Sequence, residues 1–325
     1  MLRVATRSAF LSAALLILSM LLAALAHAEV TEGGGDGPVL SQHGADDCLK
    51  CHDDDKVMGI FRTVHGKRSD PRSPFAKLQC EACHGPGSLH IKGQKHSQKS
   101  EKEGGVMPPV VFHPHSSTPT ADQDAACLEC HQDAAHVSWQ GSEHHQQGVT
   151  CSQCHKVHNG RDPMLSRTEQ ADACGTCHRK QWADSKRQYA HPLGFGKMVC
   201  TDCHNAHGGP GESLLVKPSV NETCYTCHAE TRGPFLWEHA PVSENCALCH
   251  SPHGSNNPAL LTKRSPLLCQ QCHSQAGHPS VAYDGGGLPH GSTLAGDRAL
   301  LAQGCQNCHS QVHGSNHPSG VTLTR

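Results

Sequence analysis

Residues 174–207 read CGTCHRKQWADSKRQYAHPLGFGKMVCTDCHNAH and contain the unit that organises the chain. Two Cys-x-x-Cys-His motifs, beginning at Cys174 and Cys200, enclose one histidine, His191, and another, His207, follows three residues after the second motif. This motif is the attachment site of c-type haem, in which two thiols form thioether bonds to the porphyrin and the histidine ligates the iron. The stretch therefore predicts two covalently bound haems.

Ten such motifs occur, and together they use all 20 cysteines. Zinc sites, disulfides and redox dithiols also use paired cysteines, but none of them requires a histidine directly after every pair. We therefore predict ten haem c groups. The thioether cysteines are Cys48, Cys51, Cys80, Cys83, Cys127, Cys130, Cys151, Cys154, Cys174, Cys177, Cys200, Cys203, Cys224, Cys227, Cys246, Cys249, Cys269, Cys272, Cys305 and Cys308. The proximal histidines are His52, His84, His131, His155, His178, His204, His228, His250, His273 and His309.

The motifs fall into five tandem pairs, each built of an odd-numbered and an even-numbered site, at about 48–90, 127–158, 174–207, 224–253 and 269–313. We call the histidine between the two sites of a pair the linker histidine, and the one after the second site the closing histidine. The linker histidines are His65, His144, His191, His239 and either His278 or His290; the closing histidines are His90, His158, His207, His253 and His313. His144 is preferred to its neighbour His145 because it stands seven residues before Cys151, as His239 does before Cys246.

The sixth ligand of each iron decides the chemistry, since an open position admits substrate and a filled one leaves electron transfer. Of 29 histidines, ten are proximal and His27 belongs to a predicted leader, so 18 remain for ten positions, whereas only four of the six methionines lie beyond that leader. We therefore predict bis-histidine, low-spin iron throughout, with the linker and closing histidines as distal ligands, and no catalytic residue.

Reach narrows the choice of distal ligand. Two imidazoles on opposite faces of a porphyrin, each about 2 Å from the iron, place their Cα atoms roughly 12 Å apart, whereas three residues span about 10 Å. His158, His207 and His253 therefore do not close over the haem of the motif that they follow. We expect each to serve the odd site of its own pair, with the linker histidine serving the even site.

The N-terminus predicts export. Residues 1–28 have the form of a cleaved secretory signal peptide, with Arg3 and Arg7, an apolar run to Leu25 and the site Ala26-His27-Ala28. The mature chain, 29–325, then carries 25 basic and 29 acidic residues, a charge of −4, which argues against a nucleic-acid partner.

Apolar residues are too scarce for an ordinary core, so we expect the haems to form it and the haem-free chain to be unfolded. With 32 glycines and 20 prolines, the polypeptide should be mostly irregular, with short α-helices and almost no β-structure. Regular motif spacing, 22 to 26 residues through the middle of the chain, predicts an extended, quasi-linear haem array.

The chain resembles the MtrA/DmsE-type periplasmic decahaem cytochromes over nearly its whole mature length. The resemblance rests on CEACHGP (80–86), KPSVNETCYTCHAE (217–230), LWEHAPV (236–242) and HSQVHGSNHPSG (309–320), which extend beyond the bare motif. In that family the histidine soon after the ninth site is retained, which favours His278 over His290.

The resemblance implies a cytochrome of the periplasm inserted in an outer-membrane β-barrel porin. It would conduct electrons between a periplasmic or inner-membrane cytochrome and an extracellular partner, which can itself be a multihaem cytochrome, in metal reduction or iron oxidation. Two other classes compete. A soluble periplasmic electron store would not bind a porin. A nitrite- or hydroxylamine-type enzyme would need a five-coordinate haem, often with lysine in place of a motif histidine, and no such replacement occurs.

Overall fold

The computed structural model describes residues 38–97, 106–113, 116–133, 136–273 and 304–324. The predicted signal peptide, His278 and His290 lie outside these residues. Every site discussed below belongs to one compact unit, Leu40–Arg325. In the described part of that unit no helix is long and apolar enough to span a membrane.

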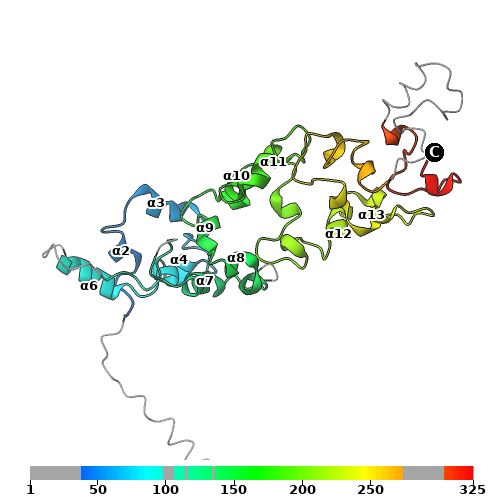
Figure 1. Cartoon of the computed structure of the whole chain (residues 1–325). Helices are drawn as coiled ribbons and strands as arrows, with labels where there is room; N and C mark the ends of the chain where they lie inside the picture. The colour runs from blue at the N-terminus through cyan, green and yellow to red at the C-terminus, as the bar shows by residue number, and fades with distance from the viewer. Residues whose placement is uncertain (1–37, 98–105, 114–115, 134–135, 274–303, 325) are drawn as a thin grey trace, which may run out of the picture. The chain divides into compact units, whose positions relative to one another are not determined.

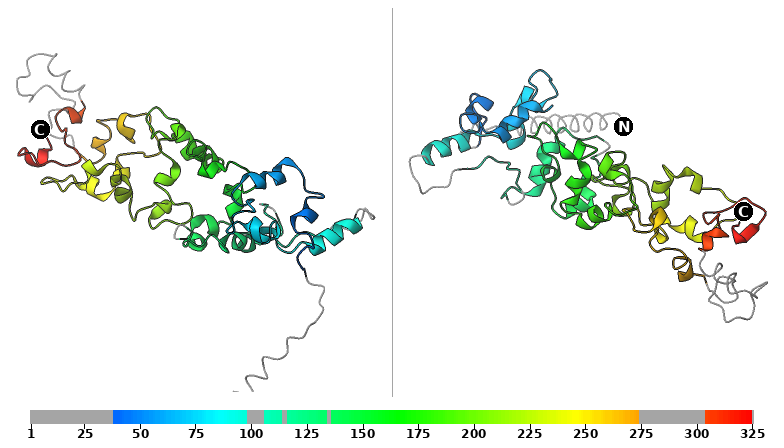
Figure 2. Two further views of the ribbon diagram at one scale, coloured as in Figure 1. Left: turned by 180° about the vertical axis from the view of Figure 1, so that it is seen from behind. Right: turned by 90° about the horizontal axis from the view of Figure 1, so that it is seen from above.

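Secondary structure consists of short helical turns joined by irregular segments (Figures 1 and 2). The longest helices among the described residues, α6 and α7, have 10 and 9 residues. The α-helices are α2 (Ala45–Cys48), α3 (Asp55–Met58), α4 (Pro74–Lys77), α5 (Glu81–His84), α6 (Ser88–Ser97), α7 (Thr120–Leu128), α8 (Glu143–Gln146), α9 (Cys151–Cys154), α10 (Gln170–Gly175), α11 (Arg179–Asp184), α12 (Val220–Tyr225) and α13 (Ala240–Glu244).

The remaining turns are 3-10 helices: η1 (Gly59–Arg62), η2 (Trp139–Gly141), η3 (Pro163–Leu165), η4 (Leu193–Phe195), η5 (Cys200–Asp202), η6 (Glu212–Leu214), η7 (Ala229–Thr231), η8 (Cys246–Leu248), η9 (Pro258–Leu260), η10 (Cys269–Gln271), η11 (Cys305–Asn307) and η12 (Gly320–Thr322). Where the structure describes the chain, β-structure is limited to isolated bridges, Tyr189 with Ser255, His204 with Leu215, Trp237 with Ser315 and His250 with Leu261. The expectation of short helices and almost no β-structure is confirmed for these residues.

Local sequence explains where several turns begin. The side chain of Asp54 caps α3 by accepting hydrogen bonds from Lys56 and Val57, and that of Ser219 caps α12 by accepting from Glu222. Such caps stabilise helix starts that are too short to persist alone. The helices therefore depend on what packs against them.

All ten motifs share one backbone arrangement. In every motif the backbone N–H of the histidine donates to the carbonyl of the first cysteine at 2.9–3.0 Å, as in His178 to Cys174 and His204 to Cys200. Four odd sites begin in the last turn of a helix (α2, α7, α10 and α12), whereas even sites begin a turn of their own (α5, α9, η5, η8 and η11). One helical turn thus holds both thiols and the imidazole of each motif in a fixed relation.

The protein interior is largely polar. Within the described residues the buried hydrophobic side chains are Ala45, Phe75, Trp139, Ala171, Val199 and Leu214. The buried polar residues form a longer list: Ser73, Glu81, Thr118, Gln123, Asp124, Ser142, Thr150, Gln170, Asp184, Asn221, Thr223, Ser255 and Ser315. Because peptide apolar burial is so small, another group must supply most of the hydrophobic stabilisation.

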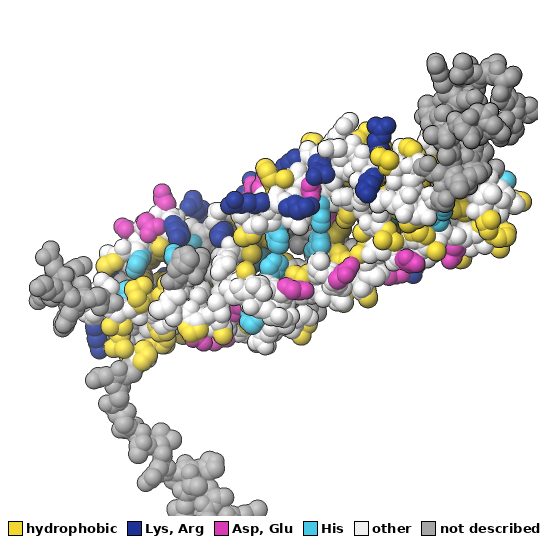
Figure 3. Space-filling model, viewed as in Figure 1, with side chains coloured by type: hydrophobic (Ala, Val, Ile, Leu, Met, Phe, Trp, Pro, Cys, Tyr) yellow, Lys and Arg dark blue, Asp and Glu magenta, His cyan; other side chains and the backbone are white. Residues whose placement is uncertain are grey.

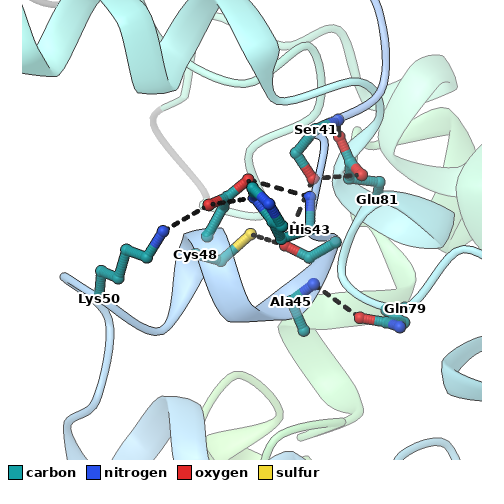
Figure 4. Close-up of polar contacts among 9 residues, drawn as sticks. Ser41, His43, Ala45, Cys48, Lys50, Gln79 and Glu81 are labelled. Carbon is teal, nitrogen blue, oxygen red and sulfur yellow. Dashed lines mark hydrogen bonds and ion pairs between the residues drawn. The ribbon is translucent and has the colours of Figure 1, made fainter.

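Polar side chains join the two sites of each of the first four pairs. In the first pair, Glu81 accepts from Ser41 N and Oγ at 2.8 and 2.9 Å, and Gln79 Oε1 accepts from Ala45 N at 2.6 Å (Figure 4). In later pairs a buried residue just before the odd site accepts from the turn of the even site. These contacts are Asp124 with Cys151 N at 3.0 Å, Gln170 with Thr201 N at 3.1 Å and Asn221 with Cys246 N at 2.7 Å.

Candidate haem sites

The first cysteines of the two sites in each pair face each other. Their thiols lie within hydrogen-bonding reach in all five pairs: Cys48 with Cys80, Cys127 with Cys151, Cys174 with Cys200, Cys224 with Cys246 and Cys269 with Cys305. The polar contacts that join the sites explain this approach. Each pair therefore brings two attachment sites side by side.

The second cysteines connect one pair to the next. The thiol of Cys83 in the first pair interacts with those of Cys127 and Cys130 in the second, and burial together with these neighbours raises the pKa of Cys83 to about 11. The equivalent electrostatic interactions join Cys154 to Cys177, Cys203 to Cys227 and Cys249 to Cys272. Consecutive sites are therefore spatial neighbours from the first to the tenth.

Eight proximal histidines face a second imidazole at one characteristic distance. The ring centroids are 5.9–6.3 Å apart in His52–His90, His84–His158, His131–His65, His155–His207, His178–His144, His204–His253, His250–His313 and His273–His239. Histidine side chains are visible inside hollows of the surface in Figure 3.

This spacing fits haem. Two imidazoles coordinated to one iron at about 2 Å, with each ring centre roughly 1 Å beyond its nitrogen, have centroids about 6 Å apart. Zinc fits less well, since no group of three or more His, Cys, Asp or Glu side chains among the described residues could hold a metal ion. A haem iron needs only the two imidazoles, because the porphyrin supplies the other ligands.

The protonation of the facing imidazoles suits coordination. Burial lowers the pKa of His65, His158, His253 and His313, with a smaller effect from a neighbouring histidine. Burial, with His136 and His155 nearby, lowers the pKa of His207 to about 4. These rings are therefore neutral near pH 7, and neutral imidazole is the form that binds metal.

Hydrogen bonds fix the orientation of the rings. Nδ1 of all five even-site proximal histidines has an acceptor: Val110 O at 3.0 Å for His84, Asp162 Oδ2 at 2.7 Å for His155, Ser213 O at 2.9 Å for His204, Ala259 O at 2.7 Å for His250 and Thr322 O at 2.6 Å for His309. A hydrogen bond from Nδ1 leaves Nε2 free to bind iron.

The linker histidines are held by the following pair. His144, His191 and His239 contact the carbonyls of Ala206, Pro252 and Val312 at 3.1, 2.9 and 3.0 Å, and each carbonyl directly precedes a closing histidine. Two backbone bridges, Tyr189 with Ser255 and Trp237 with Ser315, join the same segments. Each linker segment thus docks on the closing segment one pair further along the chain.

The predicted pairing within each module is therefore wrong for the interior sites. His158 faces His84, not His131; His207 faces His155, not His178; and His253 faces His204, not His228. Likewise His144 faces His178 instead of His155, and His239 faces His273 instead of His250. The same holds for His65, which faces His131 instead of His84. Three residues of chain are too short for a closing histidine to reach the haem of the motif that it follows. The same distance does not decide between a haem of its own pair and a haem of the neighbouring pair. Among the described linker and closing histidines with a facing ring, only His90, which faces His52, follows the expected rule.

His145 and His191 differ in their ring contacts from the histidines that face a proximal imidazole. His145 packs against Trp139, with ring centroids 6.0 Å apart, while its neighbour His144 faces His178. His191 is held by Pro252, yet among the described residues no such ring contact joins it to His228.

Two residues at the sites are not among the predicted ligands. The ring centroid of His136 lies 4.5 Å from that of His207 and 5.6 Å from that of His131. Asp162, the carboxylate on His155, has no signal beyond an acid seven residues after a motif histidine.

Comparisons with known proteins support covalent haem attachment. A doubled Cys-x-x-Cys-His family model matches residues 191–233 and 239–278, and a cytochrome c-type NrfB-like model matches residues 80–171. The multihaem cytochrome MtrA of Shewanella baltica (strain OS185) is 50% identical over 287 residues, covering 88% of this chain and 82% of that protein.

Short helices, repeated thioether motifs and facing imidazoles define a multihaem c-type cytochrome, a protein that transfers electrons. Identity at this level over most of both chains is decisive for the family. The chain belongs to the MtrA family of multihaem cytochromes.

Proposed function

We propose that this cytochrome carries ten haem c groups, all bis-histidine and low-spin, and conducts electrons across the outer membrane within a porin. Electrons pass between a periplasmic or inner-membrane cytochrome and an extracellular partner, in metal reduction or iron oxidation. Residues 1–28 direct export and are removed, and residues 29–325 form the five pairs of sites.

The observation that carries the proposal is the unbroken succession of neighbouring sites. First cysteines lie within hydrogen-bonding reach inside each pair, and second cysteines are close enough to interact electrostatically between pairs, so each site has the next as a neighbour. When bound, each haem iron supplies one-electron ferric–ferrous chemistry. The polypeptide contributes the order of the sites, the axial imidazoles and the hydrogen bonds that orient them.

Axial ligation follows the ring contacts. In the interior, a linker histidine serves the odd site of the next pair, and a closing histidine serves the even site of the previous pair. His191 then serves the seventh site, at His228, because His144 and His239 serve the fifth and ninth in the same way. His278 serves the tenth, at His309. With both axial positions filled there is no coordination site for substrate, which supports an electron carrier over an enzyme.

The membrane partner follows from the polarity of the chain. A polar polypeptide without a spanning helix in its described part crosses the hydrocarbon layer only inside a sheath that tolerates polar surface, and a β-barrel lumen does so. The resemblance to the MtrA/DmsE-type cytochromes implies the same placement.

The test combines mass, spectroscopy and transport. Affinity-tagged chain purified from solubilised outer membranes should have the mass of residues 29–325 plus ten haems, show no high-spin ferric signal and carry a β-barrel protein with it. Liposomes containing this complex and an internal reduced dye should lose dye absorbance when ferric citrate is added outside. A chain found only in the soluble periplasm, without transport, would identify an electron store. A high-spin haem that turns over nitrite or hydroxylamine would identify an enzyme.

A further inference from the structure

One even-site proximal histidine has a hydrogen-bond acceptor unlike the other four. His84, His204, His250 and His309 contact backbone carbonyls, whereas His155 contacts the carboxylate of Asp162, from Nδ1 to Oδ2 at 2.7 Å. Another proximal histidine, His228, has a carboxylate nearby, but Glu230 lies 3.5 Å away and both side chains are more than half exposed. Of these two, the Asp162 contact is the shorter and the less exposed.

Asp162 is held in place from two sides. Its Oδ1 accepts from Met164 N at 3.0 Å and so caps η3, whose first residue is Pro163. Its Oδ2 is thereby directed to His155, and the side chain is only 15% exposed. The carboxylate is a fixed part of the site and not a mobile surface group that happens to lie near the ring.

The second pair also departs from the loop used by the third and fourth. There the acceptor carbonyls, Ser213 and Ala259, lie nine residues after the proximal histidine, and both residues have positive φ, 53° and 54°. In the second pair the acceptor is a side chain seven residues after His155. A negatively charged acceptor has replaced a neutral backbone dipole at the same ring nitrogen.

The consequence follows from the chemistry of imidazole. When Nε2 binds iron, Nδ1 carries the hydrogen and donates it to the acceptor. An anionic acceptor draws this hydrogen more strongly than a carbonyl, which makes the ring a more basic ligand. A more basic ligand favours ferric over ferrous iron and lowers the reduction potential, and second-shell hydrogen bonding is one of the protein's means of setting that potential.

We propose that Asp162 is a positioning residue that lowers the reduction potential of the fourth haem, held by His155 and His207, relative to the other even-site haems. This inference rests on the bis-histidine ligation of the proposed function. The fourth haem would then have a lower reduction potential than the other even-site haems because of one carboxylate.

The test is Asp162→Asn in the full-length holoprotein, followed by redox titration monitored by electron paramagnetic resonance (EPR). The planes of His155 and His207 are 24° apart, so this haem contributes to the signal of near-parallel imidazoles. Outer-shell partners change metal affinity by about 10–100-fold. Taking the low end, we expect one component of that signal to have about a tenfold smaller ferric-to-ferrous ratio at fixed potential, equivalent to about +59 mV for one electron.

The matched control is Asp133→Asn. Asp133 makes a similar hydrogen bond, 2.6 Å, to His136, whose ring lies beside those of His207 and His131 but is not one of the proposed axial ligands. This control removes one charge that also acts on His207, without changing the acceptor of an iron ligand, so the shift in the potential of the fourth haem should be smaller than in Asp162→Asn. An equal shift in both variants, or no shift in Asp162→Asn, overturns the proposal.

A second variant separates tuning from folding. Asp162→Ser keeps an oxygen that can cap η3 and removes the charge. It should therefore raise the reduction potential of the same EPR component, even if Asp162→Asn does not accumulate. If Asp162→Ser folds with ten haems and leaves every potential unchanged, the inference fails while the conductor remains. High-spin iron or fewer than ten haems in the wild type would instead contradict the proposed function.

Discussion

Replacing His253 by methionine tests which haem each closing histidine serves. In the structure His253 faces His204 of the previous pair, with centroids 6.0 Å apart and planes at 16°. The pairing first expected from reach would place it at His228 of its own pair. Methionine in place of an axial histidine raises the potential of the haem concerned and changes its spectrum. The identity of that haem therefore distinguishes the two arrangements.

The ring planes give the size of the effect. EPR distinguishes near-parallel from near-perpendicular axial imidazoles, because their relative orientation sets the splitting of the iron d orbitals. Five described pairs have planes 16–29° apart, and two, His84–His158 and His178–His144, are at 88° and 81°. His253→Met removes one of those five near-parallel pairs and leaves four, so that signal should fall by one part in five, or one part in seven if the seventh and tenth haems also contribute.

The control is His144→Met, which acts on a near-perpendicular pair. It should reduce the near-perpendicular signal and leave the near-parallel one unchanged. Spin quantification of the fully oxidised proteins, normalised to haem content, measures both. A loss of near-perpendicular signal in His253→Met, or equal losses in both variants, would refute the pairing between neighbouring pairs.

Three further predictions concern stability. Asn221→Ala should destabilise the holoprotein by about 1–3 kcal/mol, because it leaves Cys246 N and Val242 O without their buried partner. The control Glu244→Ala, at an exposed residue, should have no effect on stability. Denaturant unfolding followed by circular dichroism measures both. Gly254→Ala should lower the free energy of unfolding by more than about 1 kcal/mol, because φ is 140° and a Cβ would overlap the carbonyl of Asp184. Gly148→Ala, at φ 73° with open space around it, should lower it less. A reversed order in thermal melts would count against this. The chain produced without haem attachment should show little helical circular dichroism and rapid proteolysis, because its peptide core is small; a folded apoprotein would contradict this.

The sequence predicted the attachment sites well and their partners poorly, for a physical reason. Cys174 to His178 form one local turn, so the motif alone defines each thiol and proximal histidine. The identity of the imidazole opposite His204 depends on contacts such as Tyr189 with Ser255, 66 residues apart, which no local pattern reveals. His136 and Asp162 likewise resemble ordinary surface residues in the sequence. Only the fold brings them to His207 and His155.

The shared ligation between pairs constrains how the length of such a protein can change. The first site has no preceding pair to supply a linker histidine, and the structure instead places His90, on α6, against His52. By the same logic we propose that the last even site takes its ligand from its own pair. Genetic gain or loss of one whole interior repeat keeps one distal imidazole for every haem iron. A truncation within the array instead leaves an iron beside the cut without its distal imidazole. Conductors of different reach can therefore arise by duplication of interior repeats between two fixed terminal ones.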